Sequence, residues 1–103
     1  MTKIKIRKET LNDEKSLVIE IAGHAGAAAM GQDLICAGIS TMAVSLAKYL
    51  REKGKGEYCI QEKAGNAEFV IPEKHIQNIE AILFGFRWMA DSFPEYVSIE
   101  EDA

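Results

Sequence analysis

The chain has 103 residues, of which 48% are hydrophobic and 27% charged, and its formal net charge is −4. This length predicts one compact domain, 1–103, because domains most often contain about 100–150 residues. The acidic balance disfavours direct binding of nucleic acid as the main function, since that function requires a basic patch. No membrane contact is expected, because no continuous apolar run approaches the about 20 residues that a bilayer requires.

Two features of the sequence bear on the cellular compartment. Residues 1–8 alternate charged with apolar side chains and lack the continuous apolar segment of a secretory signal peptide. The two cysteines, Cys36 and Cys59, are too few for a disulfide scaffold. We therefore expect a cytoplasmic protein whose cysteines are thiols and which needs no cofactor.

The first third of the chain reads as two strands and a loop. Ile4 and Ile6 alternate with charged residues, so 2–8 is predicted to be a half-buried strand. A turn over 11–15 separates it from a second, more apolar strand at 16–22. A loop over 23–32 follows, and it contains three of the eight glycines.

A long amphipathic helix is predicted after this loop. Asp33 is expected to be the N-cap residue, the helix to span about 34–53, and Gly54 to end it. Apolar residues recur at helical spacing and give the helix one core-facing stripe: Ile35, Ile39, Met42, Leu46 and Leu50.

The second half repeats the order of strands and helix. Segments 58–63 and 67–71 flank Gly65-Asn66 and are predicted to form a hairpin. Pro72 suits the first turn of a second helix that reaches about Asp91. The core-facing stripe of that helix comprises Ile76, Ile79, Leu83, Phe86 and Ala90.

A last short strand over 96–99 follows Pro94, which ends the second helix. The resulting order is ββαββαβ, and both helices are long enough to cover a sheet. We therefore predict an α+β fold of two layers, in which two helices pack on one face of a mixed sheet.

The junction of the second strand, the loop and the first helix carries the candidate chemistry. With Asp33 as N-cap, Cys36 would lie in the first helical turn, where unpaired N–H groups and the positive end of the helix dipole favour a thiolate. His24 ends the second strand, and the loop could return the chain so that imidazole meets sulfur. A cysteine beside a histidine is an activated nucleophile, and helix N–H groups could stabilise an oxyanion.

Other interpretations of these residues stay open. A cysteine in a helix is usually an inert small hydrophobic residue. Cys36, Cys59, His24 and His75 lack the paired short spacings of a zinc site, so no metal is expected. Phosphate binding at the helix start is disfavoured, because the loop lacks the lysine of a P-loop and the third glycine of a dinucleotide fingerprint.

The same residues resemble the signature of a known family, the ribosomal-processing cysteine proteases (Prp). The resemblance covers essentially the whole chain, including Phe93-Pro94-Glu95-Tyr96-Val97 after the second helix. The stretch 27–30 departs from it, because family members often carry an aromatic or charged residue there. The motif itself reads Gly23-His24-Ala25-Gly26, a short loop, and then Gly31-x-Asp33-x-x-Cys36-Ala37-x-x-Ser40.

The resemblance implies a cytoplasmic endopeptidase, usually a homodimer, that removes the N-terminal extension of large-subunit ribosomal protein twenty-seven. By position, Cys36 matches the nucleophile and His24 the general base, while Asp33 and Ser40 match supporting positions. Gly23, Gly26 and Gly31 could serve as hinges of a loop that closes on the peptide.

The role of Asp33 and the class of function each have two interpretations. Asp33 could orient the imidazole as a third catalytic residue or could cap the helix, and we favour the cap because a carboxylate so close would oppose thiolate formation. The alternative to a protease is a non-catalytic ribosome-assembly or interaction module, in which Cys36 is a packing residue.

Overall fold

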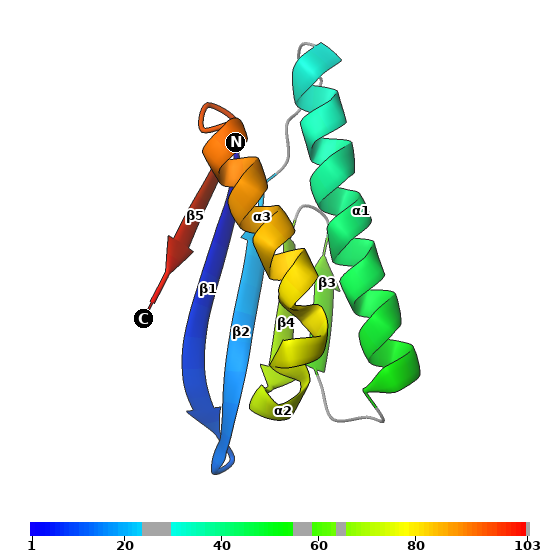
Figure 1. Ribbon diagram of the computed structural model, residues 1–103, viewed down its shortest axis with the longest axis vertical. Helices are drawn as coiled ribbons and strands as arrows, with labels where there is room; N and C mark the ends of the chain where they lie inside the picture. Colours follow the sequence, from blue (N-terminus) through cyan, green and yellow to red (C-terminus); the bar gives the residue numbers. More distant parts are fainter. Residues whose placement is uncertain (24–29, 55–58, 64–65, 103) are drawn as a thin grey trace.

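The computed structural model describes residues 1–23, 30–54, 59–63 and 66–102, without the side chains of 30–33, 59, 62 and 63. Helices and strands follow one another in the predicted order, apart from a break in the second helix (Figure 1). The elements are β1 (Thr2–Leu11), β2 (Glu14–Ala22), α1 (Met30–Lys53), β3 (Cys59–Lys63), β4 (Asn66–Pro72), α2 (Glu73–Ile76), the 3-10 turn η1 (Gln77–Ile79), α3 (Glu80–Ser92) and β5 (Val97–Glu101).

The five strands form one mixed sheet in the order β3-β4-β2-β1-β5. Neighbouring strands are antiparallel except β1 and β5, which run parallel. Both long helices, α1 and α3, cover the same face of this sheet (Figure 1). The structure thus confirms the predicted two-layer α+β fold.

The β1–β2 hairpin shows how the sequence determines the register. Leu11 pairs with Glu14 across a two-residue turn, and the two turn residues, Asn12 and Asp13, have positive φ angles of 53° and 64°. Asn and Asp tolerate this left-handed backbone, which two-residue hairpin turns require. The register places Ile4 and Ile6 in the core under the helices, as the alternation predicted.

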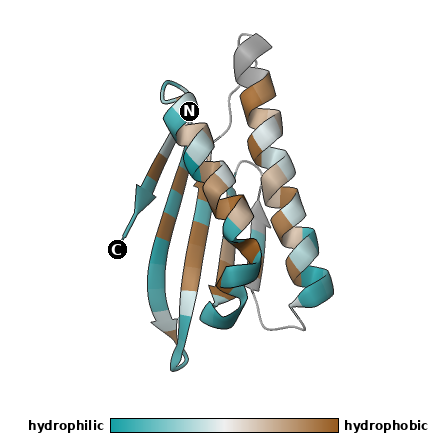
Figure 2. Cartoon of the chain, in the orientation of Figure 1, coloured by the Kyte–Doolittle hydropathy of each residue, from teal (hydrophilic) through white to brown (hydrophobic). Residues whose placement is uncertain are grey.

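The core lies between the sheet and the two helices. Both predicted stripes are confirmed, since their members are buried or packed against the core. Hydrophobic residues recur along both long helices and along the central strands (Figure 2). From the first stripe Ile35, Ile39, Leu46 and Leu50 are buried and Met42 is half-buried; from the second Ile79, Leu83, Phe86 and Ala90 are buried and Ile76 is half-buried.

The first helix begins earlier than predicted. α1 starts at Met30, so Asp33 is its fourth residue and the predicted N-cap at Asp33 is wrong. Asp and Gly are weaker helix formers than Ala or Leu, but the difference is only about 1 kcal/mol per residue or less. Neither Gly31 nor Asp33 therefore prevents the helix from starting at Met30. The C-terminal boundary, Lys53 followed by Gly54, is as predicted.

α1 is more apolar along its length than the sequence pattern suggested. Residues 34–53 are long and apolar enough, by length and composition alone, to cross a bilayer, contrary to the expectation of no such segment. The same residues supply Ile39, Leu46 and Leu50 to the core beside the sheet. Only 28% of the apolar window is buried in the structure.

The second helix is divided into three parts. Ile79 leaves the helical region, with φ −115° and ψ 11°, and separates η1 from α3. Its side chain is only 1% exposed, so the break accompanies burial of this side chain. Pro72 ends β4 and lies at the N-cap of α2, next to the position predicted for it.

Two glycines allow α1 and α3 to approach each other. A Cβ on Gly38 of α1 would lie 3.3 Å from Cε of Met89 in α3, and a Cβ on Gly85 of α3 would lie 2.5 Å from Sδ of Met42 in α1. The two helices therefore interlock through methionine side chains that occupy the space above the glycines.

Candidate active site

The elements that carry the described site residues, the end of β2 and the start of α1, lie at one end of the sheet (Figure 1). α1 begins near the end where β2 stops and β1 starts (Figure 1). Lys3, near the start of β1, pairs with Ala22 at the end of β2, and Ala22 pairs in turn with Asn66 at the start of β4. The β2–α1 connection thus leaves the sheet at the same end as the N-terminus and the β3–β4 turn.

Cys36 lies in the second turn of α1 and its side chain is half-buried. It is placed between the buried Ile35 and the exposed Ala37, at the border of the core-facing stripe. Cys36 is therefore not sealed in apolar packing. A nucleophile that attacks a peptide needs this accessibility.

The early start of α1 changes the electrostatic argument for Cys36. The sequence placed this residue in the first turn, whereas the structure places one further turn before it. The helix dipole acts mainly within the first turn, so its support for a thiolate is weaker than predicted. Helical side chains lean toward the N-terminus, however, so the sulfur is directed toward that first turn.

α1 brings three of the predicted positions onto one face. Positions 33, 36 and 40 are spaced i, i+3 and i+7, and such residues are neighbours on a helix surface. Ser40 is exposed there. Gly31 is the second residue of α1, so the structure places it in a helix, and its hinge role stays a prediction.

Gly23 ends the described part of β2 and has a distinct backbone conformation. Its φ is +81°, and a Cβ at this position would lie 2.5 Å from the backbone oxygen of Met1. Only glycine fits such a position without strain. His24 and Gly26, predicted as general base and hinge, lie outside the described residues.

A charged cluster occupies the sheet face opposite the helices. Glu20 of β2 and Glu68 of β4 are cross-strand partners, and Arg7 of β1 pairs with Glu20 at 2.9 Å. The hydrogen bond between the two carboxyls lowers the pKa of Glu20, which Arg7 lowers further, and raises the pKa of Glu68. Glu20 and Glu68 line a shallow cavity of about 440 Å³.

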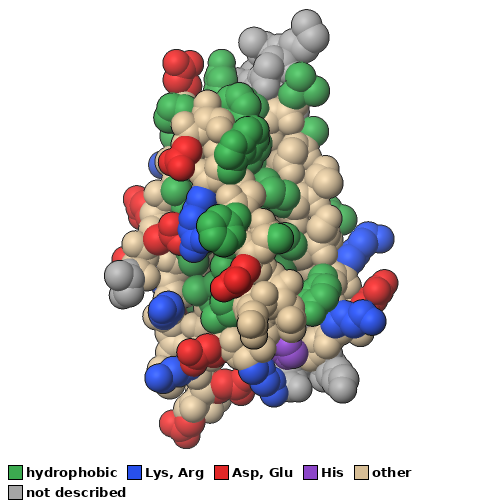
Figure 3. Space-filling view, viewed as in Figure 1, with side chains coloured by type: hydrophobic (Ala, Val, Ile, Leu, Met, Phe, Trp, Pro, Cys, Tyr) green, Lys and Arg blue, Asp and Glu red, His purple; other side chains and the backbone are tan. Residues whose placement is uncertain are grey.

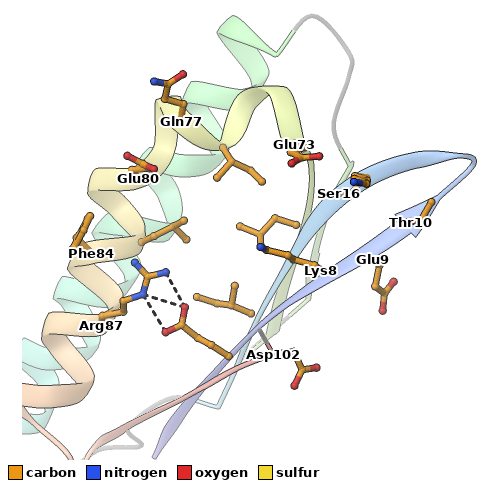
Figure 4. A pocket seen from close by; sticks show the side chains of 16 residues that line it. Lys8, Glu9, Thr10, Ser16, Glu73, Gln77, Glu80, Phe84, Arg87 and Asp102 are labelled. Atoms are coloured by element: carbon orange, nitrogen blue, oxygen red, sulfur yellow. Dashed lines mark hydrogen bonds and ion pairs between the residues drawn. The ribbon is translucent and has the colours of Figure 1, made fainter.

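A larger groove of about 800 Å³ lies between the helices and the strands near the β1–β2 turn (Figure 4), and Cys36 is not among its lining residues. Arg87 of α3 and Glu101 of β5 are joined there by hydrogen bonds of 2.8–3.1 Å, which raise the pKa of Arg87. No local motif in the sequence indicates this pair, because it depends on the register of β5 against β1.

The described residues contain no group of three or more His, Cys, Asp or Glu side chains that could hold a metal ion.

Comparison with known proteins identifies the family. The family described as cysteine protease Prp matches residues 1–98. The chain belongs to the Prp family. Among curated proteins, none matches this chain.

Prp structures share the fold. A Prp described as an essential ribosomal processing protease of Staphylococcus aureus, in complex with a substrate peptide, matches with a TM-score of 0.78 at 15% identity and 99% and 100% coverage of the two chains. The same protein with a covalently linked product peptide matches with a TM-score of 0.77 at 16% identity, and the coverage of the two chains is the same. A protein of Streptococcus mutans, SMU.848, matches with a TM-score of 0.75 at 23% identity, over 98% of this chain and 93% of the other.

Membership of the Prp family confirms the predicted class of activity. The chain is a cysteine protease, which disfavours the alternative of a non-catalytic module. The individual roles of Cys36, His24, Asp33 and Ser40, the hinges and the single-domain boundaries stay predictions.

Proposed function

We propose that this protein is an endopeptidase that removes the N-terminal extension of large-subunit ribosomal protein twenty-seven, with Cys36 as nucleophile and His24 as general base and acid. The observation that carries the proposal is the Prp family match over residues 1–98, which includes the Gly23-His24 and Cys36 motif. The S. aureus Prp, a ribosomal processing protease with the same fold, supports the substrate class.

The proposed reaction has two halves. His24 accepts the proton of Cys36, and the sulfur attacks the carbonyl carbon of the scissile bond to form a tetrahedral oxyanion. Collapse of this intermediate breaks the C–N bond, and the imidazolium donates its proton to the leaving amine. His24 then deprotonates a water that attacks the thioester, which releases the extension as a carboxylic acid and restores the thiol.

The position of Cys36 is compatible with these steps. Its half-buried side chain lies beside the exposed Ala37 and Ser40, so a peptide can approach from the solvent side of α1. Leu34 precedes the exposed Ala37 by three residues on this helix and is itself 70% exposed, so it offers an apolar contact beside Ala37.

Mass spectrometry of the extended ribosomal protein tests the proposal. Wild-type protein is expected to release the extension, and Cys36→Ala and His24→Ala are each expected to abolish cleavage while the circular dichroism spectrum stays unchanged. The matched control is Cys59→Ala, which removes the other cysteine and is expected to retain cleavage. Full cleavage by the Cys36→Ala protein would overturn the assignment.

We also propose that the protein acts in the cytoplasm as a homodimer. Exposed apolar side chains on the helix-bearing face, among them Val44 and Trp88 at 52% and 60% exposure, support association of two copies (Figure 3). Light scattering after gel filtration measures the mass: twice 11.4 kDa is expected, and a monomer at micromolar concentration would reject the dimer.

A further inference from the structure

The edge strand β5 leaves half of its neighbour uncovered. β1 spans Thr2–Leu11, but β5 pairs with it only from Thr2 to Ile6. The last rung is the hydrogen bond from the N–H of Asp102 to the carbonyl of Ile6, at 3.0 Å. Residues 7–11 of β1 therefore have no strand beside them on this side within the described chain.

The uncovered part of β1 presents backbone groups outward. Residues on one strand alternate between their two neighbours, and Ile6 bonds toward β5. Lys8 and Thr10 share the parity of Ile6, so their N–H and C=O groups point to the same open edge. Both residues are exposed. Such an edge is a template for one further strand.

The groove of about 800 Å³ lies directly beside this edge (Figure 4). Lys8 and Thr10 form part of its strand side, and α2, η1 and α3 form the other side. Ile6, Leu17 and Leu83 provide an apolar floor. Phe84 is 66% exposed at the helix side, and the Arg87 guanidinium lies 5.5 Å from its ring centre. A volume of about 300–1,000 Å³ is typical of ligand sites.

The charges around the groove favour a basic occupant. Five acidic residues line it, against the three cations Lys8, Lys15 and Arg87. Arg87 is engaged by Glu101. Glu9 is engaged in the same way by Arg7, which leaves Glu73, Glu80 and Asp102 against the two lysines.

We propose that this groove is an exosite that binds a basic, extended segment of the protein substrate by adding it to the open edge of β1. Main-chain hydrogen bonds to Lys8 and Thr10 would give affinity, and an apolar side chain beside Phe84 with flanking basic side chains would give specificity. The inference rests on the proposed function, because it requires a protein substrate.

The exosite and the candidate nucleophile lie at opposite ends of the molecule. α1 has 24 residues, includes Cys36 in its second turn and begins at the end of the sheet where β1 starts (Figure 1). The groove extends along β1 to Thr10 and Lys15, beside the β1–β2 turn. The longest extent of the chain is 44 Å. An extended segment spans about 3.3–3.6 Å per residue, so about 13 residues or fewer beyond the cleaved bond suffice to reach the groove.

The test compares two substrates with two groove variants. Thr10→Pro removes the outward N–H, which an edge strand tolerates, and Phe84→Ser removes the aromatic side of the groove. The substrates are the extended ribosomal protein and a short synthetic peptide that ends a few residues past the cleaved bond. Each variant is expected to lower kcat/KM for the protein relative to the peptide by about fivefold, the loss expected for one hydrogen bond or contact.

Matched controls separate binding from folding. Thr10→Val keeps the N–H and is expected to retain the wild-type ratio. Glu73→Lys reverses a groove charge and is expected to lower the ratio, whereas Glu100→Lys, on the sheet face opposite the helices, is expected to leave it unchanged. Thermal unfolding identifies any variant whose fold is damaged.

The two proposals fail in different ways. If the wild-type protein cleaves neither substrate, the proposed function is rejected. If it cleaves both, and Thr10→Pro and Phe84→Ser leave the protein-to-peptide ratio unchanged, the exosite is rejected. As a readout without catalysis, fluorescence anisotropy of the labelled mature ribosomal protein is expected to show about fivefold weaker binding to Thr10→Pro than to wild type; equal binding would contradict the exosite.

Discussion

At the scale of single residues, Gly23 has the strictest requirement in the candidate site. Its φ of +81° and the Met1 backbone oxygen at 2.5 Å from a would-be Cβ leave no room for a side chain. We expect Gly23→Ala to lower the free energy of unfolding by about 1–3 kcal/mol, because both the backbone and Met1 must shift. Urea unfolding measures this change; a loss below about 0.5 kcal/mol would show that the position relaxes easily.

The carboxyl pair Glu20–Glu68 makes a second residue-scale prediction, on pH. Glu68 has a raised pKa in the fold, so its stabilising contribution is present at acid pH and is lost as pH rises through that pKa. Glu20 has a lowered pKa and shows the opposite dependence. Glu68→Gln keeps a hydrogen-bond donor to Glu20 without the charge.

We therefore expect Glu68→Gln to be more stable than wild type at pH 7 by a few tenths of a kcal/mol, since the pair is partly exposed to solvent. The difference should shrink at acid pH, because the protonated Glu68 of the wild type also donates a hydrogen bond to Glu20. Thermal unfolding at pH 7 and at acid pH measures it. Equal stability at pH 7 would indicate that the two carboxyls do not interact.

At the scale of elements, the sequence predicted which face of a helix is buried better than it predicted where the helix begins. The spacing of Ile39, Leu46 and Leu50 identified the buried face of α1 because burial follows the helical period. The start of α1 was missed by four residues, because Asp33 is as suitable for a cap as for a first helical turn. The error moved Cys36 from the first turn to the second and weakened the dipole argument.

The contact between α1 and α3 yields an element-scale prediction. Gly85→Ala gains about 1 kcal/mol of helix propensity, but its Cβ displaces the Met42 side chain. Because Met42 is flexible and half-buried, we expect a net change within about 0.5 kcal/mol. Gly85→Phe is expected to cost about 1–3 kcal/mol, since the helices must separate. Urea unfolding compares the two; equal effects would mean that close approach of the helices is unimportant.

At the scale of the whole molecule, topology was the part that local patterns could not supply. Alternation identified each strand, yet nothing in 96–99 indicates that this strand pairs parallel with β1 and stops at Ile6. That pairing follows from how the second helix returns the chain across the sheet. It also creates both the Arg87–Glu101 contact and the open edge at 7–11, so neither could be inferred from the sequence.

Of the two strands that flank β1, β5 is expected to open more easily than β2. It pairs over only five residues and is the edge of the sheet, and Arg87–Glu101 joins its end to α3. Both side chains are more than one-third exposed, at 39% and 36%, so the pair should contribute less than about 1 kcal/mol to global stability. Its main effect should be local, because it holds the last rung of a short ladder.

Arg87→Gln is thus expected to change the unfolding midpoint little but to speed amide hydrogen exchange in β5 several-fold, while exchange in β2 and β4 stays unchanged. Arg51→Gln, a change at the end of α1 far along the chain from β5, serves as the charge control. In 1 M salt the wild-type β5 should approach the variant, because screening weakens the exposed pair. Unchanged exchange in β5 would show that backbone pairing with β1 alone holds this strand in place.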